Sequence, residues 1–471
     1  MTVDHKWWVL GTTSLGAFIG AVMFTGVNVA LPSLVKTFQT DFNVVQWVVL
    51  AFLLATGTLL PIVGKLADMF GKKKLYVSGY VVFTLGSLLC GFAPSIYALI
   101  AFRAVQGLGA AFLTALSLAI ITDTFPAEER GRAIGISGSL LSVGIVVGPT
   151  LGGLLIDAVS WRWIFFLAVP LGLAGTLLAQ RVIQSYHVSS ERRFDVGGAA
   201  LLFLALLSLL LALTVGQDLG FTHSYMLGLF AASAVLSALF VVVEMRVEEP
   251  VLELSLFRIP QLSVSLVTGF MTFVAISGTV FLMPFYLTDV LGYSPRSVGL
   301  LLSVVPVVLV VVTPLAGVAA DRFGERPVAL IGLVFLTGGY FALSTLTVET
   351  SALGYVLRFL PIGLGMGIFQ TPNNSAIMGS VPPERSGVAG GLLALTRTVG
   401  QSTGIAVLGT LWAARTLAEA GVSKTVDAPP QVQVTALSEM LLVIQVMIVG
   451  SLLLALWDAY IRRTAVKPAV R

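Results

Sequence analysis

The chain has 471 residues, of which 57% are hydrophobic and 11% are charged, and its mean hydropathy is +0.97. A soluble domain carries about 25% charged residues, so this composition excludes a soluble globular domain and indicates a protein of the lipid bilayer. The net charge of +4 is modest and its basic residues stand in short segments between apolar runs, which favours orientation signals over nucleic-acid binding.

The apolar runs predict fourteen membrane-spanning helices, because most reach about 18 residues or more and none shows strand-like alternation. The first run, after Lys6, is too long for the core of a signal peptide, and no small-residue cleavage site follows it. The predicted spans are 8–32, 45–67, 75–93, 96–120, 133–156, 162–183, 196–216, 225–246, 262–287, 297–320, 328–346, 352–378, 387–413 and 437–460.

Basic residues predict how these spans are oriented. An even number of spans places both termini on one side, and Lys and Arg concentrate on the cytoplasmic side of membrane proteins. With the N-terminus inside, most of the 27 Lys and Arg fall in cytoplasmic segments. We therefore expect a multi-pass protein of the plasma (cytoplasmic) membrane with both termini in the cytoplasm. The few basic residues left outside are Lys36, Arg162, Arg296, Arg415 and Lys424.

Two similar charged turns indicate an internal duplication. The stretch GKLADMFGKKK begins at Gly64, and GVAADRFGERP begins at Gly317. Arg103 returns as Arg358 at nearly the same offset. Both turns fall on the predicted cytoplasmic side, one after the second span and one after the tenth.

The duplication predicts the domain organisation of an all-α integral membrane protein. We expect two six-helix bundles, at 1–183 and 259–471, joined by a linker and two inserted helices at 184–258. Many secondary transporters are built from such repeats, with the substrate site near the bilayer midplane.

The first turn contains Asp68, Gly71 and Lys72, and the second contains Asp321, Arg322 and Gly324. Glycine permits a tight turn between two spans, and lysine holds the loop in the cytoplasm. Two interpretations stay open at this point. The turns are topology anchors, or they make contacts that break and re-form as the two bundles rock.

The fifth span contains GIVVGPTLGG at 144–153. Gly144, Gly148 and Gly152 are four residues apart, so they share one helix face and allow another helix to approach closely. Pro149 removes a backbone hydrogen bond and can bend the helix. The stretch is either ordinary tight packing or a sealing helix that governs which side of the protein opens.

Three arginines lie well inside predicted spans: Arg103, Arg358 and Arg397. Charged residues at such depth are costly and mark functional sites by default. For Arg103 and Arg358 a structural role, bonding to neighbouring backbone carbonyls, is an equal alternative. Arg397 lies nearer the middle of its span, which favours a functional role.

The twelfth span carries a polar cluster within FQTPNNSAI at 369–377. Gln370, Asn373 and Asn374 either line a cavity or act as hydrogen-bonding glue between helices. Pro372 interrupts the backbone ladder there.

On these motifs the chain resembles the major facilitator superfamily, and more narrowly its fourteen-helix drug:proton antiporter group. GKLADMFGKKK is similar to the family's signature between spans 2 and 3, and RAVQGLGAA from Arg103 to its span-4 signature. GIVVGPTLGG is similar to its antiporter signature in span 5. The resemblance implies multidrug-type export, antibiotic resistance and exchange for protons.

The resemblance also assigns roles to residues. It implies that Asp68, Lys72 and Asp123 form a cytoplasmic gating network, and that Arg103 and Asp123 take part in coupling. VMFTGVNVALP, at 22–32, is similar to the span-1 signature, but Met23 stands where the family usually has aspartate. The residues expected to contact substrate are Met23, Asn28, Phe112, Gln370, Asn373, Asn374, Arg397 and Gln401.

No Asp or Glu lies more than three residues inside a predicted span. Three buried cations without a buried anion favour neutral, zwitterionic or anionic amphiphiles over lipophilic cations. Proton exchange would require a group with a raised pKa, and the candidates stand at helix ends: Asp68, Asp123, Asp157 and Asp289.

The leading interpretation is a secondary active transporter that exports lipophilic small molecules by alternating access. An exporter of lipids or an uncoupled facilitator is the alternative. Cys90 is the single cysteine, and the three histidines fall outside the spans, so we find no nucleophile–base pair or metal cluster and expect no enzyme and no cofactor. The expected partners are the substrate, protons and membrane lipids, with the chain acting as a monomer.

Overall fold

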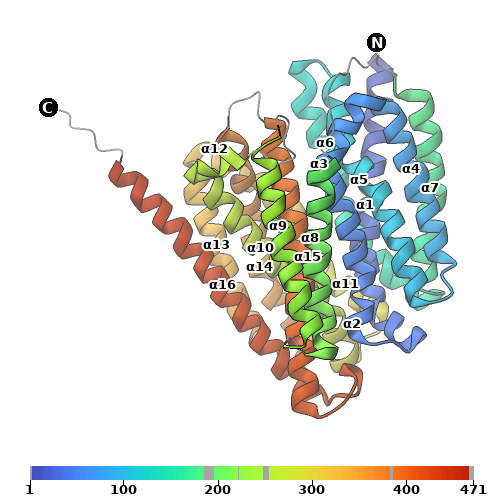
Figure 1. The fold of residues 1–471 in the computed structure, drawn as a ribbon, viewed down its shortest axis with the longest axis vertical. Helices are drawn as coiled ribbons and strands as arrows, with labels where there is room; N and C mark the ends of the chain where they lie inside the picture. Colours follow the sequence, from blue (N-terminus) through green and yellow to red (C-terminus); the bar gives the residue numbers. More distant parts are fainter. Residues whose placement is uncertain (1–2, 185–195, 221, 248–253, 382–385, 466–471) are drawn as a thin grey trace. The chain divides into compact units, whose positions relative to one another are not determined.

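The computed structural model describes the backbone of residues 3–184, 196–220, 222–247, 254–381 and 386–465. Within these ranges the regular structure is helical throughout, with no strand (Figure 1). This confirms the all-α membrane fold. Parts of the predicted linker at 184–258 lie outside the described residues.

Long helices follow the apolar runs of the sequence, and short helical turns join some of them. The α-helices are α1 (Val3–Phe38), α2 (Phe42–Val45), α3 (Trp47–Phe70), α4 (Lys72–Gly91), α5 (Ile96–Thr124), α6 (Ala127–Ala158), α7 (Arg162–Val182), α8 (Val196–Leu219), α9 (Ser224–Glu244), α10 (Pro260–Phe285), α11 (Pro295–Leu302), α12 (Val304–Phe323), α13 (Glu325–Leu343), α14 (Ala352–Gly379), α15 (Ser386–Ala420) and α16 (Pro430–Ala465). The short elements are η1 (Leu254–Arg258), the π-helical η2 (Tyr286–Val290) and η4 (Thr425–Asp427).

Twelve of the described helical segments are long and apolar enough to cross a membrane. Helices also occupy the two other predicted spans, as α8 and α15. In α8 the described apolar stretch is the short Ala200–Ala212. In α15 the polar residues of TRTVGQST, at 396–403, lower the hydropathy of a 35-residue helix. The structure thus supports twelve spans, and the predicted count of fourteen is not confirmed.

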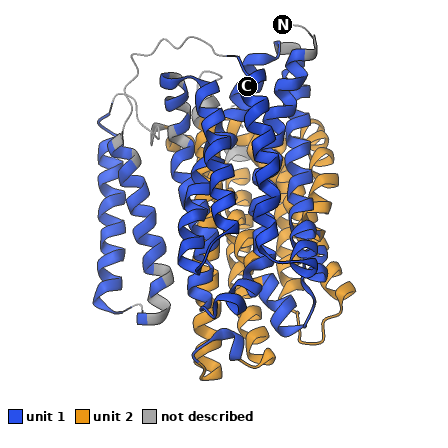
Figure 2. Ribbon diagram, turned by 90° about the vertical axis from the view of Figure 1, so that its right-hand side faces the viewer, with its two compact units in different colours: residues 1–251, 283–303, 423–427 blue, residues 252–282, 304–422, 428–471 orange. Residues whose placement is uncertain are grey.

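By backbone contacts the described chain divides into two compact units, coloured separately in Figure 2. Unit 1 comprises 1–251, 283–303 and 423–427, and unit 2 comprises 252–282, 304–422 and 428–471. In unit 1, α1 packs on α5, α6 and α7, while α4 packs on α5 and α7, α8 on α9, and α11 on α6. In unit 2, α14 packs on α12 and α13, and α16 packs on α13 and α15.

The two repeated turns have the same backbone geometry. Gly71, between α3 and α4, has φ 92° and ψ 133°, and Gly324, between α12 and α13, has φ 91° and ψ 151°. Only glycine adopts this region without strain. The helices that carry Arg103 and Arg358 also begin alike, because Ser95 and Ser351 each accept a hydrogen bond from a backbone N–H three residues on.

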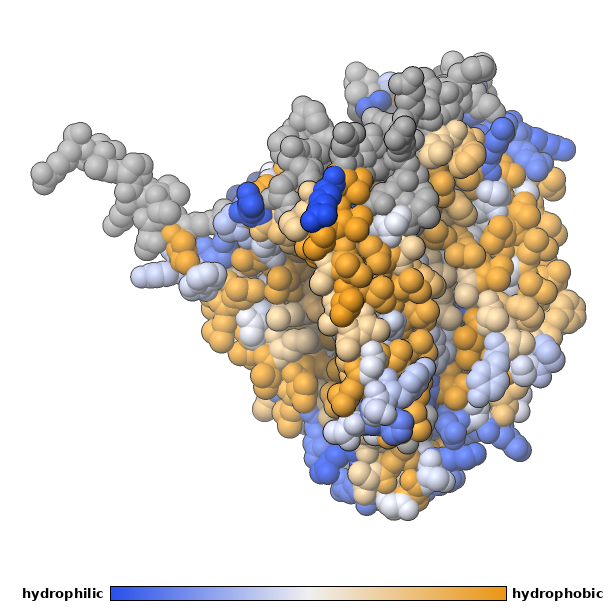
Figure 3. Space-filling model, in the orientation of Figure 1, coloured by the Kyte–Doolittle hydropathy of each residue, from blue (hydrophilic) through white to orange (hydrophobic). Residues whose placement is uncertain are grey.

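Many apolar side chains on the outside of the helices are exposed, as expected where lipid is the solvent. Leu315, Val318 and Val446 are more than 60% exposed. In Figure 3 apolar residues cover much of the visible surface, and hydrophilic residues stand towards both its upper and its lower edge. This distribution matches helices that cross a bilayer and end in polar loops.

Candidate functional site

The glycine stripe of α6 lies directly on α1. A Cβ atom built at Gly148 would stand 2.0 Å from Thr25 Oγ1 and 2.9 Å from the carbonyl oxygen of Val22. A Cβ built at Gly152 would stand 2.8 Å from the carbonyl oxygen of Gly26. Side chains essentially never approach backbone this closely, so the contact between α1 and α6 depends on the missing side chains. Gly144 packs on α1 in the same way.

A second face of α6 meets α11, also within unit 1. A Cβ at Gly153 would stand 2.3 Å from the carbonyl oxygen of Pro295, and one at Gly299 would stand 2.2 Å from that of Pro149. The hydroxyls of Thr150 and Ser303 lie 2.7 Å apart. We call this packing, residues 149–153 against 295–303, the α6–α11 contact.

An ion pair lies in the same unit. Lys36 Nζ, at the end of α1, is 3.0 Å from Asp289 Oδ1 in the π-helical turn η2. The Asp289 side chain is 10% exposed and that of Lys36 is 56% exposed. The ring centroids of Phe42 and Phe285 stand 4.9 Å apart, in a second contact between the same regions. The sequence presented Lys36 only as an orientation signal and Asp289 only as a proton candidate, so it did not reveal their pairing.

At the end of unit 1 that carries the Gly71 turn, Lys72 Nζ donates to Asp123 Oδ2 at 2.5 Å. The structure therefore brings together two of the three residues expected in the gating network. The side chain of Asp68 lies outside the described residues. Lys6 and Glu129 form a further ion pair.

The corresponding turn of unit 2 is arranged differently. Asp321 and Arg322 are exposed, and Arg322 lies over the ring of its neighbour Phe323 at 5.6 Å. Neither forms an ion pair with a residue that the structure describes. The structure places both at the surface, without an ion-pair partner on any helix that it describes.

Arg103, on α5, is fully buried and belongs to a polar chain between three helices. Its Nε donates to the carbonyl oxygen of Val48 at 2.9 Å, and its Nη1 donates to Gln106 Oε1 at 2.5 Å. Gln106 Nε2 in turn donates to Ser87 Oγ on α4 at 2.7 Å. The guanidinium also lies 4.3 Å from the centroid of the Phe52 ring. Its Nη2 is buried without a hydrogen-bond partner among the described residues.

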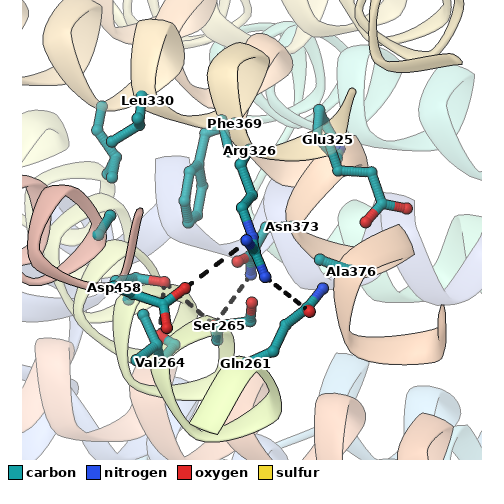
Figure 4. A pocket seen from close by; sticks show the side chains of 15 residues that line it. Gln261, Val264, Ser265, Glu325, Arg326, Leu330, Phe369, Asn373, Ala376 and Asp458 are labelled. Carbon is teal, nitrogen blue, oxygen red and sulfur yellow. Dashed lines mark hydrogen bonds and ion pairs between the residues drawn. The ribbon is translucent and has the colours of Figure 1, made fainter. Parts of the chain in front are cut away.

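A pocket in unit 2 lies between α10, α13, α14 and α16 (Figure 4). Arg326 points across it, donating to Gln261 Oε1 at 2.9 Å and standing 4.0 Å from Asp458. Asn373 is buried and donates to the carbonyl oxygen of Ser265 at 3.1 Å. Asn373 thus ties α14 to α10 and also lines the pocket, so its surroundings fit both roles that the sequence allowed.

The other residues expected to contact substrate are distributed over both units. In unit 1, Met23 and Asn28 are buried on α1, and Asn28 Oδ1 has no partner among the described residues. Phe112 is half-buried, and its Cβ lies against Gly79 of α4. In unit 2, the half-buried residues are Gln370 and Asn374 on α14 and Arg397 and Gln401 on α15.

Comparison with known proteins defines the class. The family model of the Major Facilitator Superfamily matches residues 13–405, so the chain belongs to that superfamily. The multidrug resistance protein Stp of Mycobacterium tuberculosis is 36% identical over 428 residues, which cover 90% of this chain and 79% of that protein. The riboflavin transporter RibZ of Clostridioides difficile is 30% identical over 412 residues, covering 87% of this chain and 89% of that protein.

Among solved structures, the chain resembles a bacterial homologue of the human lysosomal transporter Spinster, in an inward-facing and unoccupied conformation. The TM-score is 0.70 at 17% sequence identity, and the match covers 97% of both chains. At this identity the likeness establishes the fold. Within the described residues, no group of three His, Cys, Asp or Glu could hold a metal ion.

Proposed function

We propose that the chain is a secondary active transporter that exports lipophilic small molecules, of the multidrug type, by alternating access and exchange for protons. Membership of the superfamily and the 36% identity to a protein named for multidrug resistance support this function. The internal repeat supports it independently, because duplicated bundles provide the two bodies that alternating access requires.

The observation that carries the proposal is the α6–α11 contact. It joins a helix of the first repeat to a helix of the second through bare backbone, the Thr150–Ser303 hydroxyl pair and a bond from Ser303 Oγ to the Val146 carbonyl oxygen at 3.2 Å, with no ion pair among the described residues of the contact. Close glycine packing provides van der Waals contact without interlocked side chains. Such a surface can separate and re-form without the disruption of interlocked side chains. A gate must open and close in this way.

The distribution of Lys and Arg supports an orientation with both termini in the cytoplasm. In that orientation the α6–α11 contact and the Lys36–Asp289 pair close the outer side, and the Lys72–Asp123 pair stands on the cytoplasmic side. We therefore assign outer gating to Gly144, Gly148, Pro149 and Gly152. Inner gating is assigned to Asp68, Gly71, Lys72, Asp123, Asp321 and Arg322.

For topology we propose fourteen spans, with α8 and α15 crossing the membrane besides the twelve apolar segments. The 24-residue length of α8 and the 35-residue length of α15 support this count. The two six-helix bundles, 1–183 and 259–471, then flank α8 and α9 as an inserted pair. Membership of the fourteen-helix drug:proton antiporter group follows from the same count.

For coupling we propose Arg103 and Asp123. Arg103 has a buried nitrogen without a described partner, so it can gain a bond when its surroundings rearrange. The buried Met23 offers no proton-binding group at the position where the family has aspartate. An uncoupled facilitator is the alternative, and a protonophore separates the two, because only an antiporter loses uphill export when the pH gradient collapses.

A cross-link across the α6–α11 contact tests the gate. The only native cysteine, Cys90, is buried and is first replaced by alanine. Thr150→Cys and Ser303→Cys are then introduced together, because the two hydroxyls lie 2.7 Å apart. In sealed vesicles with an imposed pH gradient, oxidation should stop dye export and a reductant should restore it.

The matched controls are the two single-cysteine variants, whose transport should not respond to the oxidant. Undiminished export by the fully cross-linked protein would show that the contact never opens. That result would contradict the proposal that the α6–α11 contact opens during alternating access.

A further inference from the structure

Arg397 lies well inside α15. This helix is unusual because several polar residues stand beside Arg397 in its sequence. The arginine is eleven residues from the start of α15, or about 16 Å along the helix axis. Its side chain is half-buried, and its guanidinium carbon stands 5.8 Å from the ring centroid of Phe273 on α10. Both residues belong to unit 2.

The guanidinium of Arg397 differs from those of Arg103 and Arg358 in having no polar partner among the residues that the structure describes. Arg103 donates to Val48 and Gln106, and Arg358 donates to Thr345 and Gly354. For Arg397 the described part of the chain supplies no hydrogen bond and no ion pair, only the Phe273 ring. A guanidinium offers five N–H donors, and none of those of Arg397 bonds to a described residue.

The position of this group is fixed by tight packing beside it. A Cβ at Gly404 would stand 2.3 Å from the carbonyl oxygen of Val274, and one at Gly400 would stand 3.0 Å from that of Phe270. Ser277 Oγ donates to the backbone carbonyl of Gln401 at 3.0 Å. These contacts clamp α15 against α10 just after Arg397, so the arginine and Phe273 are held side by side on rigid elements.

The electrostatic surroundings leave the positive charge uncompensated. No Asp or Glu lies more than three residues inside any predicted span, and the described ion pairs of unit 2 all involve residues near helix ends. An unpaired cation inside a membrane-spanning bundle is costly. A bound anion would remove much of this cost, because carboxylate and phosphate accept paired hydrogen bonds from arginine.

We infer that Arg397, backed by the Phe273 ring, binds the anionic head group of the transported molecule. The substrates are then amphiphiles that carry a carboxylate, sulfonate or phosphate on an apolar body, which Phe273 contacts, rather than lipophilic cations. This inference rests on the proposed export of lipophilic small molecules and names their chemical class.

Binding to the purified full-length chain in detergent tests the inference without requiring transport. Three probes share one nitrobenzoxadiazole fluorophore and one alkyl chain, and end in a carboxylate, its methyl ester or a quaternary ammonium group. The wild-type chain should bind the carboxylate about tenfold or more tightly than the ester, since bonds to a charged partner contribute at least that factor. The quaternary ammonium probe should bind most weakly.

Two substitutions at the arginine separate recognition from structure. Arg397→Gln should lose the preference for the carboxylate while binding the ester as before, and Arg397→Lys should keep part of that preference. Arg358→Gln is the matched control, because it removes another arginine of a span and should leave all three affinities unchanged. Equal loss of all three probes in Arg397→Gln would contradict the inference, as would tighter wild-type binding of the quaternary ammonium probe.

The inference can also be tested on the wild-type chain, so the test does not depend on whether a variant folds. Rising salt should weaken binding of the carboxylate and leave the ester unaffected, and equal salt response of the two probes would contradict the inference. Sodium acetate should compete poorly, because it has the charge without the apolar body; effective competition would identify a site for free anions. If the bound carboxylate probe is not exported from vesicles, the proposed function fails while the assignment of Arg397 stands.

Discussion

The two repeats place an arginine at the same point of the sequence, yet the two arginines have different surroundings. Arg103 is fully buried and bonded to Val48 and Gln106, whereas Arg358 is half-buried and donates to Thr345 and to Gly354 of its own helix. Each lies about 10 Å from the start of its helix. The same local sequence position therefore supports a buried network in one repeat and a near-surface bond in the other.

The cause is visible three residues further on. Gln106 accepts from Arg103 and passes the chain of hydrogen bonds to Ser87. The residue three after Arg358 is Pro361, which has neither a polar side chain nor a backbone N–H. The two copies of the motif therefore differ at this one position, and of these two arginines only Arg103 is fully buried.

Removing that partner should have the largest effect. Gln106→Leu leaves the buried Arg103 with the Val48 carbonyl as its single described hydrogen-bond acceptor, and losing a hydrogen bond to a charged group costs about 1.5–3 kcal/mol. We expect this loss in the free energy of unfolding, measured in mixed detergent micelles. A change below about 1 kcal/mol would mean that the network contributes little to stability.

Adding Arg103→Met to Gln106→Leu should restore about 2 kcal/mol of the loss, because the stranded charge is then absent. The double-mutant cycle is measured in the same micelles, with Arg103→Met alone as the third corner. Additive losses at the two positions would show that Arg103 and Gln106 do not act as one unit.

The repeated turns should respond equally, in contrast to the arginines. Gly71→Ala and Gly324→Ala each force alanine into a backbone region open only to glycine, at a cost of about 1 kcal/mol or more. Unfolding of the two single variants provides the measurement. A clear inequality between them would indicate that one turn relaxes and the other cannot.

Arg358→Met should have the smallest effect, no more than about 0.5 kcal/mol, because the bonds of a half-exposed arginine to the exposed Thr345 and to its own helix contribute little. The same unfolding measurement applies, with the wild-type chain as reference. A loss comparable to that of Gln106→Leu would remove the distinction between the two repeats.

Much of the fold could be predicted from the sequence, because hydropathy and helix-forming pattern are local properties. The apolar runs indicated helices at positions where the structure has them, and the repeat of Gly64 at Gly317 indicated a duplicated protein. The glycines of 144–153 indicated close helix packing, and α6 does pack at Gly148 against α1. The polar residues in α15 were also visible, although they keep that helix below the hydropathy of a typical span.

The tertiary structure alone decided which residues meet. Lys36 and Asp289 stand far apart in the chain, and nothing local to either predicts their ion pair. From the sequence Asn373 could line a cavity or bond to a neighbouring helix, and only the structure shows that it does both, in the unit 2 pocket and at Ser265. The sequence does not show that Arg103 has polar partners while Arg397 has none among the described residues. The functional groups of a side chain determine what it can bind. The faces on which the helices pack determine which residues lie next to it.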